Sequence, residues 1–394
     1  MTRGSIIFAC SKIEPGTCGV GDYTRRLGDR LAGQGFNIAI LAMADPAVQK
    51  PTERQFDGEH KIDVLQLPPG SLSSNKAKAL AKSFIAARHP GWMSVQFGGF
   101  YHYQAKGIPL GTVERMAGIF SNQKTQITFH ELWVPWHPSI PLRHRLMGCW
   151  QREALVRGVK RLAPSACFTT NRVDQNRLAR RQIISSIAPV FSNIPLNPDS
   201  VDWLEGKLLE RSVLLGPNDR IAVVFGSIPG GWSPFETLSK LAKSIMQHGS
   251  SGKVILVVIG RSGHRAPGAL AALRAAMGNS LVIVELGEQA PEVISGVLQV
   301  AHLGLALYKW GDNERSGSAA AMREHGLPVV AEVPLQGADQ VTDAPGIVRV
   351  DRLPIDAMRA LHRGKDWDGL AVTAGQYAQV FSELNELERL THLP

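Results

Sequence analysis

The sequence has few cysteines and no low-complexity tract. Its four cysteines, Cys10, Cys18, Cys149 and Cys167, stand far apart, with no CxxC pair and no histidine-rich spacing suited to a metal. These absences argue against a disulfide framework and against a bound metal ion. They favour reduced thiols in a cytoplasmic protein, because disulfides persist mainly in oxidising compartments.

Long apolar runs are also missing. No run approaches the roughly 20 residues that a membrane-spanning helix needs. The apolar run near the start of the chain, Ser5–Cys10, is too short for the core of a signal peptide. We therefore expect a soluble protein, or one that is peripheral at the inner face of the cell membrane.

What the chain does have is length and positive charge. Its 394 residues suffice for two domains of ordinary size. It carries 43 Lys and Arg against 34 Asp and Glu, for a formal net charge of +9. An excess of this size suggests an acidic partner, which would be the phosphates of a nucleotide, a nucleic acid or an anionic membrane surface.

The first half of the chain reads as alternating strands and helices. A buried strand at Ser5–Cys10 is followed by a glycine loop that contains Gly19 and Gly21, then by a helix and a strand at Asn37–Met43. Because the glycines lie well past the strand, this unit fits a dinucleotide site poorly, and we rank NAD binding low. A glycine loop that approaches some other ligand remains the interpretation.

Aromatic residues and histidines follow two further strands of this half. Tyr101 and His102 come after a strand at Trp92–Phe97, whereas a strand at Thr125–Phe129 is followed at once by the candidates His130, Glu131 and Trp133. The carboxyl ends of parallel strands meet at one edge of a sheet, where open α/β folds bind ligands. A lone histidine is usually structural, but His130 is placed at such an edge beside a carboxylate. We also expect a short strand and turn at Leu162–Ser165.

A basic stretch lies between residues 141 and 181. Only Glu153 and Asp174 oppose its ten basic residues, which are Arg143, Arg145, Arg152, Arg157, Lys160, Arg161, Arg172, Arg177, Arg180 and Arg181. The plain interpretation is a solvated helix face, and the functional one is contact with anionic lipid headgroups. No stacking or recognition-helix pattern accompanies the arginines, so nucleic acid is not expected as a partner.

The second half repeats the α/β pattern after a linker at Ser192–Pro198. Its predicted strands Ile221–Phe225, Val254–Ile259 and Leu281–Leu286 are followed by Gly226 and Ser227, by Arg261, and by Glu288, respectively. Two Rossmann-like halves would place their carboxyl edges across one cleft. A late apolar stripe at Tyr377, Phe381, Leu384 and Leu387 predicts a terminal helix that packs back on the first domain.

The loop after the predicted strand Leu303–Leu307 is the strongest candidate for a binding site. An alanine-rich helix follows it, so the loop ends at a helix N-terminus, where free N–H groups suit a phosphate. The alternative is that a serine there merely caps the helix. The clustered charges favour a binding site, and its residues are Lys309, Glu314, Arg315, Ser316, Gly317 and Ser318.

Five segments of the chain together resemble GT-B-fold glycosyltransferases of the family-4 type, also known as glycosyl transferases group 1. They are Gly19–Leu27, Thr128–Trp133, Ala163–Ser165, the paired strand ends Val224–Gly226 and Val258–Gly260, and Gly326–Val330. The resemblance implies an α/β protein with two Rossmann-like parallel-sheet domains. It implies an N-terminal acceptor domain at 1–192, a donor domain at 193–371, and the terminal helix at 372–394.

The resemblance also implies an activity. Such enzymes move a sugar from a nucleotide-diphosphate sugar to a glycan, glycolipid or small-molecule acceptor, without a bound cofactor or metal. In this chain it implies a hexosyltransferase of bacterial-type polysaccharide assembly that retains configuration, with His130 and Glu131 catalytic. Tyr101, His102 and Trp133 would bind the acceptor. The donor would contact Gly19, Gly21, Gly226, Ser227, Arg261, Glu288, Lys309, Glu314, Arg315, Ser316, Gly317 and Ser318.

The sequence departs from this family in two places. The second of two glutamates that are usually seven residues apart is Ala321 here, and the usual Arg and Lys are absent after the first donor-domain strand. These departures leave an inverting reaction open. They also leave open a GT-B nucleotide-sugar epimerase that uses Glu131 and Glu285, or a catalytically inactive sugar-nucleotide-binding subunit.

Overall fold

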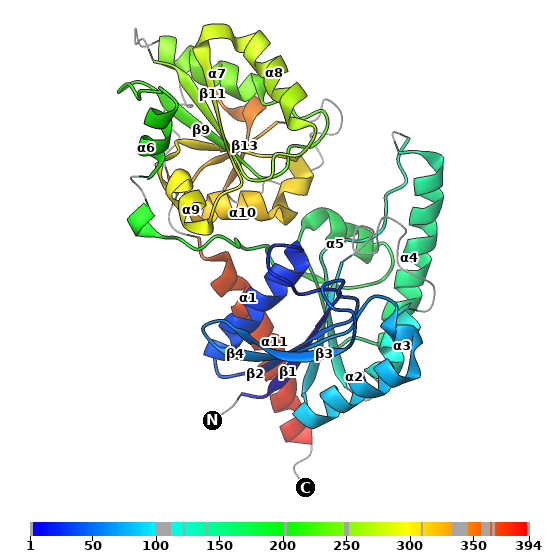
Figure 1. Cartoon of the computed structure of the whole chain (residues 1–394). Coiled ribbons are helices and arrows are strands. Elements are labelled where there is room, and N and C mark those ends of the chain that lie inside the picture. Colours follow the sequence, from blue (N-terminus) through cyan, green and yellow to red (C-terminus); the bar gives the residue numbers. More distant parts are fainter. Residues whose placement is uncertain are drawn as a thin grey trace. The chain divides into compact units, whose positions relative to one another are not determined.

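The computed structural model describes residues 3–98, 112–120, 123–138, 140–200, 203–247, 252–308, 310–332, 346–355, 363–364 and 367–391. The chain forms two compact units, drawn in Figure 1. Unit 1 consists of Met1–Pro189 and Leu370–Pro394, and unit 2 of Val190–Gly369. Each unit is built on one sheet, as predicted for an α/β protein with two Rossmann-like domains.

The sheet of unit 1 has the strand order β3-β4-β2-β1-β5-β6-β7-β8. Its neighbours pair in parallel, except for the antiparallel pair of β3 and β4. The strands are β1 Ser5–Cys10, β2 Asn37–Ala42, β3 Thr52–Asp57, β4 Lys61–Gln66, β5 Trp92–Phe97, β6 Lys124–Phe129, β7 Ala166–Thr169 and β8 Ser186–Ile187.

Two details of unit 1 differ from expectation. The edge strand β3 was not predicted, because its polar sequence TERQFD lacks the apolar alternation of a half-buried strand. The predicted strand and turn at Leu162–Ser165 is wrong. Helix α4 (Leu142–Leu162) runs up to that point and ends at Ala163 in a left-handed conformation with φ 43°, and the strand that follows is β7.

Helices cover both faces of this sheet. Side chains of α2 (Asn75–Arg88), α3 (Thr112–Ile119) and α4 share one apolar core with the sheet. The other face lies under α1 (Gly19–Gly33) and α11 (Gly369–Thr391), whose Tyr377 and Phe381 pack on rings of the sheet strands. Figure 1 shows α11 in red running along this sheet. The remaining helices of unit 1 are α5 (Arg172–Ala179) and the 3-10 turn η1 (Ser71–Ser73).

The sheet of unit 2 is wholly parallel, with the order β11-β10-β9-β12-β13-β14. Its strands are β9 Arg220–Phe225, β10 Val254–Ile259, β11 Leu281–Gly287, β12 Leu303–Leu305, β13 Val329–Ala331 and β14 Ile347–Arg349. The interior strand β10, VILVVI, is buried along its whole length. A continuous apolar run of this kind is typical of a parallel sheet that helices cover on both faces.

Two apolar cores lie on the two faces of the second sheet. One includes side chains of α6 (Trp203–Glu210), α9 (Pro291–Val300) and α10 (Gly317–Glu324), and the other includes those of α7 (Phe235–Met246) and α8 (Ala266–Met277). The 3-10 turns are η3 (Pro198–Ser200), η4 (Gly278–Ser280), η5 (Trp310–Arg315) and η7 (Val350–Arg352). No helix within the described ranges has the length and apolar character to cross a membrane.

The strand orders define where each sheet changes direction. In unit 2 the chain moves outward from β9 through β10 to β11, and then returns to the other side of β9 with β12. In unit 1 the corresponding change falls between β1 and β5. Ligands of open α/β sheets bind at the carboxyl ends of the strands beside such a reversal. The fold therefore directs attention to the turns that follow β9 and β12, and to those that follow β1, β5 and β6.

Candidate functional site

In unit 2, the turn after β9 lies directly against the start of α10. Gly226 has φ +111°, and a Cβ atom added to it would lie 2.8 Å from Ser318 Oγ and 3.3 Å from Leu307 Cδ1. Side chains rarely adopt this backbone conformation, and no space is left for one here. Glycine at this position therefore lets the backbone that follows β9 approach the N-terminus of α10.

A second glycine turn packs against the first. Gly260 follows β10 with φ +98°, and an added Cβ would lie 3.2 Å from the Gly226 nitrogen. The Gly226 N–H donates to the carbonyl of Ile259 at 3.0 Å, and the Gly260 N–H donates to that of Gly287 at 2.7 Å. Three neighbouring strand ends are thus joined backbone to backbone.

The N-terminus of α10 offers hydrogen-bond donors at the same place. Ser316 is the N-cap, and its Oγ accepts from the N–H of Ala319 at 3.2 Å. Its own N–H donates to the Asn313 carbonyl at 3.1 Å. Within the described part of the chain, the N–H groups of Gly317 and Ser318 have no hydrogen-bond partner. Free N–H groups at a helix N-terminus, together with the helix dipole, form an anion site.

Two buried side chains that the sequence reasoning missed hold this loop in place. Asn313 is 1% exposed, donates through Nδ2 to the Tyr308 carbonyl at 2.8 Å, and accepts from the Tyr308 N–H at 3.3 Å. Trp232 is 9% exposed and donates its Nε1–H to the Ala306 carbonyl at 3.0 Å. It closes the loop after β9 onto the chain after β12. The only sequence signal for either role was a lone tryptophan after a glycine-rich turn.

The other predicted donor residues extend along the same strand ends. Ser227 Oγ donates to the Arg261 carbonyl at 2.7 Å, and Arg261 forms an exposed ion pair with Glu288 at 2.7 Å. Hydrogen bonding within this pair raises the pKa of Arg261 and lowers that of Glu288. Arg315 is exposed at the end of η5. The strands β9, β10 and β11 are neighbours in the sheet, and Figure 1 labels β9 and β11. Lys309, Tyr101 and His102 lie outside the described residues.

In unit 1, His130 follows β6 directly and is 8% exposed. Its Nε2 lies 2.9 Å from Gln96 Oε1, and the ring of Tyr23 meets it edge-on at 4.6 Å between centroids. Because an amide oxygen can only accept, this geometry places a proton on Nε2. The partner that the structure shows at Nε2 is Gln96.

Gln96 belongs to a buried row of polar side chains under α11. Its Nε2 donates to Ser94 Oγ at 2.9 Å, Ser94 Oγ donates to Gln126 Oε1 at 2.6 Å, and Gln126 Nε2 donates to Thr128 Oγ1 at 2.9 Å. The hydroxyl of Tyr377 contacts Thr128 Oγ1 and lies 3.5 Å from Gln96 Nε2. Burial raises the pKa of Tyr377, so the phenol remains neutral. The ring of His130 is therefore connected by hydrogen bonds to α11.

Gly19 and Gly21, which were predicted in a loop before the first helix, instead lie in the first turn of α1, and one of them has a packing role. A Cβ on Gly21 would lie 2.6 Å from the Lys12 carbonyl oxygen, so α1 lies close against the loop, whereas one on Gly19 would meet nothing within 4 Å. Asp45, which follows β2, is 1% exposed. It accepts from the Ile13 N–H and from Gln66 Nε2, both at 2.9 Å. Its carboxylate is therefore engaged in holding the loop.

The loop after His130 is fastened to α5. The guanidinium of Arg177 lies 4.8 Å from the Trp133 ring centroid and donates to the Trp133 carbonyl. Arg177 also pairs with the buried carboxylate of Asp174 at 2.8 Å. Glu131 is partly buried. Trp133 is thus held by packing on one side, and Arg177 is engaged within the fold rather than on the surface.

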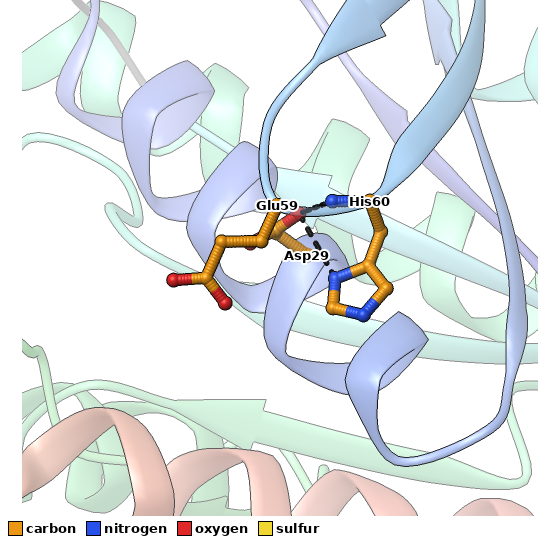
Figure 2. A group of neighbouring side chains, drawn as sticks. All are labelled: Asp29, Glu59 and His60. Atoms are coloured by element: carbon orange, nitrogen blue, oxygen red, sulfur yellow. Dashed lines mark hydrogen bonds and ion pairs between the residues drawn. The ribbon is translucent and has the colours of Figure 1, made fainter.

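Two other carboxylate groups lie outside these edges. Glu285, the second carboxylate proposed for an epimerase, lies within β11 and pairs with Arg274 at 2.9 Å, with both side chains about half exposed. Asp29, Glu59 and His60 have ligand atoms within 4.8 Å of one another, the one such metal-compatible group in the described residues. Asp29 Oδ1 accepts from the His60 N–H at 2.9 Å and lies 3.4 Å from His60 Nδ1. Figure 2 shows the Glu59 carboxylate pointing away from this pair, which fastens the β3–β4 turn to α1.

Comparison with known proteins shows the fold. No protein-family model matches the sequence, and no curated protein matches it. Trehalose-6-phosphate synthase from Burkholderia multivorans superposes with a TM-score of 0.53 at 11% identity, over 98% of this chain and 100% of that one. Anabaena HepE in complex with UDP gives 0.51 at 12% identity, over 99% and 100%.

A third solved structure agrees. The catalytic domain of Arabidopsis thaliana starch synthase IV, bound to ADP and acarbose, gives a TM-score of 0.51 at 11% identity, over 96% of this chain and 99% of that one. These matches extend over nearly the whole of each chain and include both sheets. They confirm the predicted GT-B fold with two Rossmann-like parallel-sheet domains.

Proposed function

We propose that this protein is a glycosyltransferase that uses a nucleotide-diphosphate sugar, with the diphosphate at the N-terminus of α10. The observation that carries this proposal is the contact between Gly226 and Ser318, where an added Cβ would lie 2.8 Å from the hydroxyl. That contact places unpartnered N–H groups of α10 beside two glycine turns at the reversal point of a parallel sheet. A diphosphate is the ligand that suits such a surface of backbone donors.

The ligands of the structural neighbours support this choice. The matched HepE structure holds UDP, and the matched starch synthase holds ADP. Both are nucleoside diphosphates, the group that a nucleotide-sugar donor leaves behind. In this chain we assign the diphosphate to the N–H groups of Gly317 and Ser318 and to the guanidinium of Arg315. Ser227, Arg261, Glu288 and Glu314 would contact the rest of the donor.

The missing glutamate is the main feature of this chain as a family-4 variant. Its position is Ala321, which is fully buried against the core of unit 2. The side chain at that position therefore cannot make the ribose contact that the glutamate makes in the family. We propose that the donor is held mainly by backbone groups and Arg315.

His130 is proposed as the central residue of the reaction in unit 1. In a transfer that retains configuration, the acceptor hydroxyl oxygen attacks the anomeric carbon. The bond from that carbon to the diphosphate oxygen breaks, and the diphosphate accepts the hydroxyl proton. With its Nε2 held by Gln96, His130 would orient a sugar hydroxyl or the acceptor rather than exchange a proton. Glu131 and Trp133 follow it at the same edge.

One observation favours a second candidate, an inactive subunit that binds sugar nucleotides. Ala321 removes a family carboxylate without an evident replacement, and such a loss could leave binding without turnover. An epimerase is less well supported, because Glu285, which lies within β11, forms an ion pair with Arg274. For the active enzyme, we propose a hexosyltransferase acting on a glycan, glycolipid or small-molecule acceptor. We place it in bacterial-type polysaccharide assembly at the cytoplasmic face of the cell membrane.

The test begins with a thermal-shift screen against UDP, GDP, dTDP and ADP, because a ligand that binds only the folded state raises the melting temperature. Arg315→Ala should weaken the preferred nucleotide by roughly ten- to a hundredfold, since it removes a charge-assisted contact. Arg274→Ala, outside the site, is the control and should bind normally. Unchanged affinity in Arg315→Ala would contradict the assignment.

A second measurement separates the two candidate functions. Release of the nucleoside diphosphate from its sugar in the presence of acceptor extracts identifies a transferase. Tight donor binding without release, across a range of glycan and lipid-linked acceptors, would instead support the inactive subunit.

A further inference from the structure

One helical layer of unit 1 is strongly basic. Helices α2, α3 and α4 cover the same face of the sheet, and α3 packs against both of the others. Glu114 and Glu153 are the acidic residues of these three helices. Their basic residues are Lys76, Lys78, Lys82, Arg88, Arg115, Arg143, Arg145, Arg152, Arg157, Lys160 and Arg161. Figure 1 shows the three helices next to one another along one side of the sheet.

Large apolar side chains are exposed where α4 begins. The helix packs on the preceding loop at Gly148, where an added Cβ would lie 2.2 Å from the Val134 carbonyl oxygen. The turns before that contact have no buried residue. Leu142 and Leu146 are 55% and 57% exposed, one helical turn apart, and Trp136 in the loop is 59% exposed. These three side chains contribute little to the core of unit 1.

Basic side chains surround this apolar group and continue along α4. Arg145 lies over the Trp136 ring at 5.1 Å from its centroid, and Arg143 is exposed beside Leu142. Farther along the helix, Arg157, Lys160 and Arg161 are exposed and have no carboxylate partner within the described ranges. Glu153 is paired with Arg152 at 3.1 Å, so it does not offset these charges.

The α2–α3 side of the layer contributes a basic groove. Its volume is about 470 Å³, and Lys78, Lys82 and Arg115 line it together with Asn75, Ala79, Gly118 and Ile119. Among the residues that the structure describes, no acidic one lines it. A groove of this composition suits a phosphate-bearing headgroup, because lysine and arginine both bind phosphate.

We propose that the α2–α3–α4 face docks on an anionic phospholipid membrane. Trp136, Leu142 and Leu146 would enter the interface, and the lysines and arginines would lie at the headgroups. Tryptophan prefers the membrane interface, apolar side chains of an amphipathic helix enter it, and basic residues are attracted to anionic lipid. A nucleic acid would use the charges but not the exposed leucines. The proposal specifies the surface for the membrane location proposed above, and it does not depend on sugar transfer.

The main test is sedimentation of the full chain with phosphatidylcholine vesicles that contain or lack phosphatidylglycerol. We expect binding to the anionic vesicles alone, with strong weakening at high salt. Leu142→Ser with Leu146→Ser should weaken binding by roughly tenfold for each leucine, from the apolar area lost. The matched control is Leu209→Ser with Leu214→Ser, two leucines of unit 2 that are 62% and 78% exposed. The control should bind like the parent protein.

A charge series tests the rest of the face. Each neutralised residue should weaken vesicle binding about fivefold, as expected for about 1 kcal/mol per basic residue. The variants are Lys78→Gln with Lys82→Gln, and Arg157→Gln with Lys160→Gln. Lys243→Gln with Lys253→Gln, on exposed lysines of unit 2, is the control. Melting temperatures should be unchanged throughout, because these side chains are largely outside the core.

Several outcomes would overturn the proposal. Equal binding to neutral and anionic vesicles, or none to either, would do so, as would leucine variants that bind normally. Equal losses in the unit 2 controls would show that net charge rather than this face matters. Self-association of the protein alone that is abolished by the leucine changes would identify the face as a contact between copies. Nucleotide binding, measured without vesicles, stays independent of all these results.

Discussion

The carboxyl edges of the two sheets are built from different kinds of chemical groups. In unit 2, the glycine turns after β9 and β10 meet through backbone atoms, and Gly226 lies against the Ser318 hydroxyl at the N-terminus of α10. The groups that remain available in the described residues are the N–H groups of that helix N-terminus. In unit 1, the edge at His130 is built from side chains, with Gln96 at the ring and Thr128 and Tyr377 farther along the row. The edge of unit 2 presents main-chain groups, and the edge of unit 1 presents an imidazole ring that side-chain hydrogen bonds hold in place.

The difference has consequences for how each edge can be damaged. A backbone surface depends on the absence of side-chain atoms, so adding a methyl group is severe and deleting a hydroxyl is mild. A side-chain row depends on hydrogen bonds between buried groups, so deletions are severe because they leave partners unsatisfied. The two edges should therefore respond in opposite ways to substitutions of similar size.

The largest effect is expected at Gly226. Gly226→Ala forces a side chain into φ +111° and places its Cβ 2.8 Å from Ser318 Oγ, so nucleotide binding should fall by about a hundredfold or more. Ser318→Ala alone should cost less than about tenfold, the value of one hydrogen bond. Isothermal titration with the preferred nucleoside diphosphate measures both.

Two further variants separate the effect of backbone strain at Gly226 from the effect of its steric contact with Ser318. Gly231→Ala has a similarly positive φ of +76° but meets nothing within 4 Å, so it should lose stability without losing nucleotide affinity. In Gly226→Ala with Ser318→Ala, the removal of the hydroxyl should restore part of the affinity. A double variant that is no better than Gly226→Ala would mean that the contact with Ser318 is unimportant.

His130→Ala should lower turnover by about a hundredfold or more with nucleotide affinity nearly unchanged, and it should also lower the melting temperature because Gln96 Oε1 loses its buried partner. The physical reason is the loss of a group that orients substrate, whereas the nucleotide is assigned to unit 2. Steady-state kinetics and titration of the same preparation check both parts. Near-normal turnover, or simple unfolding, would place the chemistry elsewhere, and Glu131 would be tested next.

Tyr377→Phe tests whether the side-chain row supports His130. The change leaves Thr128 and Gln96 without a buried hydroxyl partner, which should lower the free energy of unfolding by roughly 1–3 kcal/mol. Turnover should fall more than nucleotide affinity. Tyr308→Phe is the control for stability, because Tyr308 is 44% exposed and its hydroxyl can be solvated. If the two variants unfold alike, the row does not stabilise unit 1.

The smallest expected effect is a dependence of the unfolding free energy on pH, and it would limit the contrast between the two sheet edges. His325 ends α10, where Nδ1 lies 2.7 Å from the Ala321 carbonyl and Nε2 lies 3.0 Å from Ser295 Oγ. Burial, with a smaller contribution from Arg363, lowers its pKa below the ordinary value of 6.5. The unfolded chain then binds the proton more readily. This contribution to stability is complete above about pH 6.5 and is lost as the pH falls through the lower, folded pKa.

Chemical denaturation between pH 7.5 and 5 measures this effect. We expect the unfolding free energy to fall on acidification through this residue. His325→Gln should flatten that part of the profile, since it cannot take up the proton. An unchanged slope in the variant would assign the acid sensitivity to other groups.

Local signals account for the parts that sequence reasoning reached. Runs such as Val254–Ile259 show their burial in their composition, and the start of α10 follows from a serine before an alanine-rich run with Gly326 at its end. The long-range links were missed. Asn313 and Trp232 look like ordinary loop residues, and their roles depend on carbonyl groups that only the folded chain places nearby.

The sequence by itself determined the two α/β units and the helix that begins after Ser316, because apolar periodicity and capping residues act over a few neighbouring positions. The GT-B fold was implied by the resemblance of its motifs to known glycosyltransferases. The tertiary structure alone decided that Gly226 touches Ser318, that Gln96 holds the Nε2 of His130, and that Tyr377 lies 281 positions from that glutamine yet beside it. These contacts join residues far apart in the chain. They follow from strand order and from burial, which sequence periodicity does not specify.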